Sequence, residues 1–279
     1  MLRRFFDFLI FSSLFIAGCA VIMVYQVNDI FQLHYPAKPY LWFVFFSTIC
    51  SYNFHWYFTP HTASENRRIV WTHQHKGLHL LLILVGCIGA FLFFLQLAEY
   101  WKWIGISVIL TFLYSAPKLP FRPAQFLRKI AVGKTIFLST VWMYVTSALP
   151  IILSGEKWGI SHLLFCMGRF FLIYAICIIF DFRDREQDKL EGIKSMITVF
   201  TEKGINILFY SSIIVFLLST IALYFLGLSI ALVILLLGPG LIVGLSYRYM
   251  KKNFSDYLYY CALDGMMAFS ALLTSFLPF

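Results

Sequence analysis

The sequence from Ser161 to Phe180 is SHLLFCMGRFFLIYAICIIF, and Arg169 is its only charged side chain. Twenty residues in an α-helix rise about 30 Å, which is the thickness of the hydrocarbon core of a bilayer. Asp181 follows directly, and acidic and basic residues alternate after it. This stretch therefore predicts a helix that crosses a membrane and ends in a charged, water-facing segment.

Apolar stretches of similar length recur along the whole chain. Of the 279 residues, 61% are hydrophobic and 13% are charged, and the mean hydropathy is +0.81, far from a soluble average. We therefore expect one all-α domain over residues 1–279, embedded in the lipid bilayer. Nine spans are predicted, near residues 8–27, 39–58, 78–97, 99–117, 134–153, 161–180, 205–226, 228–246 and 257–277.

The first and eighth spans each carry a feature with a second interpretation. Arg3 and Arg4 before an apolar stretch imitate a signal peptide, and residues 16–19 (IAGC) resemble a lipoprotein cleavage site. The apolar run continues beyond Cys19, so we interpret the segment as an ordinary first helix. In the eighth span, residues 238–240 (GPG) would allow a kink or a re-entrant shape.

Basic residues predict the orientation of the chain. The formal net charge of +9 would suggest nucleic acid for a soluble protein, but here Lys and Arg lie in short loops, and we expect no nucleic-acid partner. Alternate connecting segments hold 18 of them against three in the other set. Basic loops stay in the cytoplasm, so we expect a multi-pass protein of a bacterial inner membrane, with the N-terminus cytoplasmic and the C-terminus outside. The basic segments are the N-terminus, 59–77, 118–134, 181–204 and 247–256.

Three carboxylates follow the sixth span. Asp181, Asp184 and Asp188 are spaced by three and four residues, so on a continuing helix they fall within an arc of about 60°. Clustered carboxylates repel each other, and a hard cation such as Mg²⁺ accepts their oxygens and leaves positions for phosphate oxygens. Arg185 and Lys194 are placed to hold the rest of a diphosphate. The alternative is a solvated, salt-bridged loop.

The pattern Asp-x-x-Asp-x-x-x-Asp, followed by Gly-Ile-Lys-Ser at 192–195, resembles the second aspartate-rich motif of the UbiA-type membrane prenyltransferases. The likeness extends to residues 114–117 (YSAP) with Lys118 and Lys134, to Asp264-Gly265, and to nine spans in this orientation. The resemblance implies a ring of nine helices around a central cavity that is open to lipid. It also implies Mg²⁺-dependent transfer of a prenyl chain from its diphosphate to a lipophilic acceptor, usually an aromatic quinone precursor.

The resemblance also implies roles for single residues. The three aspartates would be the metal ligands and, together with Lys194, the catalytic residues. The residues expected to bind substrate are Asn53, Tyr57, Tyr114, Lys118, Lys134 and Arg185.

The first acidic motif of the family is degenerate here. The aligned stretch is NFHWYFTPH, in which Asn53 is retained and Phe54, Tyr57 and His61 take the places of acids. His61 or Glu65 would have to substitute, although Mg²⁺ prefers oxygen to imidazole. A loop or membrane-interface position is the plainer interpretation of the histidines, namely His61, His73, His75 and His79.

A prenyl diphosphate ionises to an allylic cation, which aromatic faces such as those of Trp56 and Tyr114 could shelter. Two further charges, Arg169 and Asp264, lie inside spans, and we expect a structural ion pair between them rather than a substrate contact. Three functions remain open. The first is a prenyltransferase, and the second is a non-catalytic UbiA-like protein that binds a polyprenyl phosphate or a quinone-type lipid. The third is a transporter.

Overall fold

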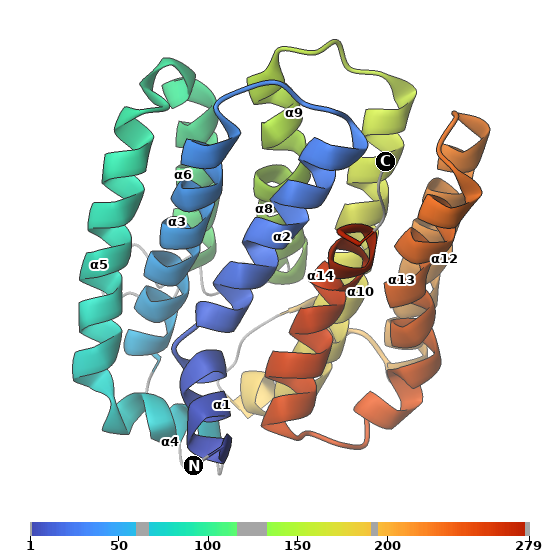
Figure 1. Cartoon of the computed structure of the whole chain (residues 1–279). Helices are drawn as coiled ribbons and strands as arrows, with labels where there is room; N and C mark the ends of the chain where they lie inside the picture. Colours follow the sequence, from blue (N-terminus) through green and yellow to red (C-terminus); the bar gives the residue numbers. More distant parts are fainter. Residues whose placement is uncertain (1, 60–66, 116–132, 191–194, 277–279) are drawn as a thin grey trace.

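The computed structural model describes residues 2–59, 67–115, 133–190 and 195–276. Within these ranges the chain is helical between short turns and contains no strand. The long helices run alongside each other in one bundle (Figure 1), as the all-α prediction required. The helices, in chain order, are α1 (Leu2–Phe11), α2 (Leu14–Ile30), α3 (Ala37–Tyr57), α4 (Arg67–Gln74), α5 (Lys76–Leu95), η1 (Ala98–Tyr100), α6 (Trp101–Ser115), α8 (Lys134–Met143), η4 (Tyr144–Ala148), α9 (Leu149–Ser154), α10 (Ile160–Leu190), α11 (Met196–Val199), α12 (Glu202–Phe225), α13 (Ile230–Met250), η5 (Leu258–Leu263) and α14 (Asp264–Thr274).

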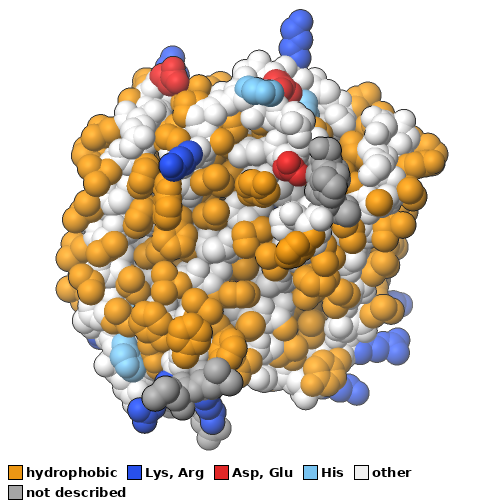
Figure 2. Space-filling view, in the orientation of Figure 1, with side chains coloured by type: hydrophobic (Ala, Val, Ile, Leu, Met, Phe, Trp, Pro, Cys, Tyr) orange, Lys and Arg blue, Asp and Glu red, His pale blue; other side chains and the backbone are white. Residues whose placement is uncertain are grey.

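Five helical stretches are long and apolar enough to cross a membrane. A sixth is added if the bent pair α1 and α2 is one span. Hydrophobic side chains cover the middle of the face in Figure 2, and most of the Lys and Arg side chains lie toward its two ends. This distribution is typical of a protein whose middle faces lipid. The five stretches are Lys76–Leu95, Lys134–Ser154, Ile160–Glu186, Glu202–Phe225 and Ile230–Met250.

The first predicted span is not one straight helix. It consists of α1 and α2, which are bent by 61° at Ser12 and Ser13. Ser13 has φ +67°, a left-handed conformation that interrupts the helical hydrogen bonds. The side-chain amide of Asn53, on α3, donates a hydrogen bond to the carbonyl oxygen of Ser12 at 3.0 Å. A buried side chain thus satisfies a backbone group at the bend.

The sixth and eighth predicted spans are both continuous helices. At 31 residues, α10 is about 46 Å long and extends beyond a hydrocarbon core of about 30 Å. The helix therefore continues through the three aspartates, as the one-face prediction required. Likewise, α13 is unbroken through Pro239, so the structure has no re-entrant segment there.

The order of packing brings the ends of the chain together. The first long helix, α2, packs against both α3 and α14, and α10 lies between α8 and α12. A buried cluster that includes Met23, Ile173, Phe209 and Leu263 joins these helices. The N-terminus, α1, α4 and the C-terminal end of α10 meet at one end of the bundle (Figure 1). We call this end, which carries Arg67, Arg68 and Arg183, the basic end.

Candidate functional site

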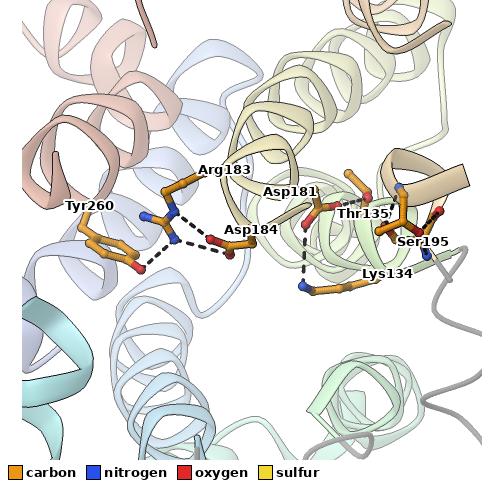
Figure 3. A network of polar contacts seen from close by, with 8 residues as sticks. Lys134, Thr135, Asp181, Arg183, Asp184, Ser195 and Tyr260 are labelled. Carbon is orange, nitrogen blue, oxygen red and sulfur yellow. Dashed lines mark hydrogen bonds and ion pairs between the residues drawn. The ribbon is translucent and has the colours of Figure 1, made fainter. Parts of the chain in front are cut away.

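Asp181 lies at the basic end, where α10 meets the first turn of α8. Its side chain is buried, and its carboxylate accepts a hydrogen bond from the hydroxyl of Thr135. The Nζ atom of Lys134 is 3.6 Å from the other carboxylate oxygen (Figure 3). Two residues that the sequence proposed for one site, Lys134 and Asp181, therefore come together from different helices. The Lys134 side chain retains 34% of its exposure, so it also faces water.

Asp184 turns toward a different neighbour (Figure 3). The guanidinium group of Arg183 donates to both of its carboxylate oxygens, at 2.8 and 3.4 Å. The same guanidinium donates to the hydroxyl of Tyr260 at 2.9 Å and stacks on the Tyr259 ring at 4.6 Å. Arg183 thus connects the second aspartate to η5 and neutralises its charge.

The last turns of α10 are held against the following segment. Asp188 is buried, and Arg185 donates to the carbonyl oxygen of Phe200 at 3.0 Å. Arg185, expected to bind substrate, therefore takes part in joining α10 to the residues after α11. Lys189 pairs with Glu186 at the surface at 2.8 Å.

The arrangement does not match a ready-made Mg²⁺ site. Within the described ranges, no three His, Cys, Asp or Glu side chains are grouped closely enough to hold a metal ion. The oxygens of Asp181 and Asp184 already accept bonds from Thr135 and Arg183, respectively. Both carboxylates would have to exchange these partners before they could share a cation.

Asn53, expected to bind substrate, lies inside the bundle. Its side chain is fully buried and donates to the carbonyl oxygens of Ser12 and Ile49. Its own side-chain oxygen accepts a hydrogen bond from Nδ1 of His79 at 2.7 Å. All the polar atoms of this amide are therefore used within the protein. His79 itself is fully buried in the first turn of α5, so the prediction of a loop position is wrong for this histidine, while a position near the membrane interface stays a prediction.

Arg68 is a central residue that the sequence argument missed. It is 3% exposed, and its guanidinium carbon lies 4.0 Å from the Trp56 ring centre and 4.3 Å from the Tyr260 ring centre. Its backbone N–H donates to the Asp256 carboxylate at 3.2 Å. Burial lowers the pKa of Arg68, and the negative charge of nearby groups, including Asp256, opposes that shift. The signal in the sequence is that Arg68 belongs to a pair of adjacent arginines after a predicted span that ends in aromatic residues. Basic residues in such a position also predict orientation, which hides their structural role.

A second missed contact joins the N-terminus to this cluster. Asp7 is buried and pairs with Arg67, and it accepts a hydrogen bond from the hydroxyl of Tyr257. Because α1, α4 and the segment before η5 meet here, residues distant in the chain build the basic end together. An acidic residue in an N-terminal helix that begins with two arginines was the available signal.

The two charges predicted to pair inside the membrane do not. Among the described residues, Arg169 donates to Gln26 at 2.9 Å and forms no ion pair. The electrostatic partners of Asp264 are instead Arg68 and Arg183 at the basic end. The reason is axial position, since Asp264 lies at the junction of η5 and α14, nearer the basic end than Arg169.

The remaining predicted residues are only partly placed. Tyr57 lies in the last turn of α3, and the Lys76 ammonium is 5.9 Å from its ring centre. Tyr114 belongs to the end of α6, and its side chain is outside the described part of the chain. Four further candidate residues lie outside the described ranges altogether, namely His61, Glu65, Lys118 and Lys194.

No protein-family model, curated protein or solved structure matches this chain. The likeness to UbiA-type enzymes therefore depends on the sequence motifs alone.

Proposed function

We propose that this chain is a UbiA-type membrane prenyltransferase, which binds an isoprenoid diphosphate at the basic end and transfers its prenyl chain to a lipophilic acceptor. The observation that carries the proposal is the pair of the buried Asp181 on α10 and the partly exposed Lys134 on α8. Both belong to segments that resemble the family. On this proposal all nine predicted spans cross the membrane in a ring, and the basic end faces the cytoplasm.

The chemistry would be a substitution on an aromatic ring. The bond between the first prenyl carbon and the bridging oxygen breaks, and its electron pair leaves with the diphosphate. An aromatic carbon of the acceptor forms a bond to the allylic cation, and the proton on that carbon then passes to the departed diphosphate or to water. Charge on the departing diphosphate is the main demand, and cationic side chains such as Lys134 and Arg183 would meet it. A divalent cation would supply further charge neutralisation when bound, in competition with the present partners of Asp181 and Asp184.

A second candidate is a non-catalytic protein of similar architecture that binds a polyprenyl phosphate or a quinone-type lipid. Two observations favour it. Asn53 is fully occupied by bonds within the protein, and Arg68 already covers the faces of Trp56 and Tyr260. Rings that hold an arginine do not have those faces free for an allylic cation.

Binding and transfer can be measured separately on the purified protein. Farnesyl diphosphate is the probe, with and without Mg²⁺, and the melting temperature reports binding. Metal-mediated binding predicts that Asp184→Asn loses the Mg²⁺-dependent rise. Binding by cationic side chains alone predicts that Asp184→Asn keeps or strengthens binding, because Arg183 is released from its carboxylate. Glu186→Gln is the matched control, since Glu186 is an exposed carboxylate on the same helix.

Transfer is tested by pyrophosphate release in the presence of a hydroxybenzoate acceptor. Release that requires both substrates and falls at least tenfold in Lys134→Gln supports the enzyme. Tight binding without release for any aromatic acceptor would favour the binding protein instead. If farnesyl diphosphate fails to bind in either condition, the prenyltransferase proposal is wrong, and only the quinone-type ligand of the second candidate remains.

A further inference from the structure

A small cavity lies inside the bundle, well away from the basic end. It has a volume of about 30 Å³ and lies between α2, α10, α12, α13 and α14. Its polar lining residues are Gln26, Arg169, Thr220 and Ser270, and all four are buried. Arg169 precedes Asp181 by 12 residues on α10, so about 18 Å of helix separates the cavity from the candidate site.

Arg169 brings a positive charge into this cavity without a carboxylate to balance it. A guanidinium group has five N–H donors, and among the described residues only the side-chain oxygen of Gln26 accepts from it. The Phe165 ring lies 5.1 Å away, on the same helix. A charged side chain in the middle of a span is costly unless another group compensates it. The described protein groups compensate the Arg169 charge with only one hydrogen bond and one aromatic face.

The other polar lining residues supply the Gln26 amide oxygen, which accepts from Arg169, and two hydroxyl groups, which can donate. Gln26 uses its amide N–H to donate to Thr274 at 3.1 Å, which fixes its oxygen toward Arg169. The hydroxyls of Thr220 and Ser270 form no hydrogen bond with any described residue. Gly168 keeps the helices close, since a Cβ there would lie 3.3 Å from the Thr220 hydroxyl. Thr220 is thereby held next to the turn of α10 that carries Arg169.

We propose that this cavity binds a small monovalent anion, of the halide class, with chloride as the natural ligand. One guanidinium charge is balanced by one negative charge, so the occupied site would be neutral inside the membrane. A divalent phosphate or sulfate would leave an uncompensated negative charge. The lining residues are all buried, including the apolar Leu223 and Leu236, which favours a small ion over a lipid headgroup. This inference is independent of the prenyltransferase proposal.

The test uses the full chain, purified in detergent at constant ionic strength. Chloride replaces gluconate in steps, and the melting temperature is recorded at each step. We expect a rise of a few degrees that saturates with chloride and is reproduced by bromide but not by sulfate. Arg169→Gln should abolish the dependence. Arg248→Gln, which removes the same charge from an exposed position on α13, should keep it.

Thr220→Val provides a second variant in case Arg169→Gln does not fold. It removes one donor with little change in volume, and we expect the chloride concentration at half-saturation to rise severalfold. Crystals grown in bromide should show anomalous scattering beside Arg169. Equal melting temperatures in chloride and gluconate, or a dependence that survives Arg169→Gln, would overturn the proposal and leave a cavity that holds water.

Discussion

Replacing Asn53 with alanine distinguishes a structural role from a substrate contact. The substitution removes hydrogen bonds to Ser12, Ile49 and His79 from a fully buried position. The Ile49 carbonyl belongs to a continuous stretch of α3, so the main losses are the Ser12 carbonyl at the bend and Nδ1 of His79. Each buried group left without a partner costs about 1–3 kcal/mol, and interhelical bonds in membranes lie at the low end of that range. We therefore expect the free energy of unfolding to fall by about 2–4 kcal/mol.

Thermal unfolding in detergent provides the measurement. A change of 1 kcal/mol shifts the midpoint by about 2–4 °C for a chain of this size, so Asn53→Ala should melt about 4–16 °C lower. Ser51→Ala is the control on the same helix, because its hydroxyl makes one 3.3 Å bond to its own helix backbone. It should shift the midpoint by no more than about 2 °C. If Asn53→Ala unfolds like the wild type but loses farnesyl diphosphate binding, the structural reasoning is refuted.

Three further predictions concern charge and packing. In a double-mutant cycle, Lys134→Met and Asp181→Asn should show a coupling of about 1 kcal/mol in unfolding free energy. This coupling is smaller than that of a fully buried ion pair, because a third of the lysine side chain is exposed to water. Gly240→Ala should lower the free energy of unfolding by about 1–3 kcal/mol, because the added Cβ would lie 2.0 Å from a ring carbon on α12. Gly238→Ala is the control: its Cβ would face open space, so the melting temperature should not change. Burial raises the pKa of the Asp256 carboxyl group above 3.8, so the folded state binds the carboxyl proton more tightly than the unfolded state does. The free energy of unfolding should therefore fall as the pH rises from 3.8 through the raised pKa, and the melting temperature should fall with it. In Asp256→Asn this part of the pH dependence should disappear.

The helical framework was predictable because lipid imposes simple rules. A span needs about 20 apolar residues with all backbone groups bonded internally, and runs such as Lys76–Leu95 satisfy both conditions by composition. Helical spacing made a continuation of α10 through Asp181 and Asp188 one of two alternatives, and the structure has the helix rather than the loop. The bend at Ser13 was not predictable in this way, because hydropathy does not register one residue in a left-handed conformation.

The pairing of the charges could not be predicted from spacing along the chain. Asp184 bonds to its immediate neighbour Arg183. The position of that guanidinium group depends in turn on Tyr260, which lies 77 residues after Arg183 in the chain. The expected pair of Arg169 and Asp264 failed for a similar reason. Depth along the membrane was inferred from span boundaries, which carry errors of several residues, while an ion pair requires contact within a few ångströms.

The charges of the basic end have a consequence for any ligand that binds there. The Arg183–Asp184 and Lys134–Asp181 pairs each hold a cation and a carboxylate together, so an incoming diphosphate meets cations that are already partly neutralised. A metal ion, conversely, meets carboxylates that are already bonded. Either ligand competes with an existing pair for the same charges, and the partner it draws away then becomes more available to the other ligand. Diphosphate and a divalent cation should therefore bind with positive coupling, because each removes part of the cost that the other would incur. The absence of three of the four residues expected in the first acidic motif makes that coupling more important, since neither ligand has a second set of charges on α3 to hold it.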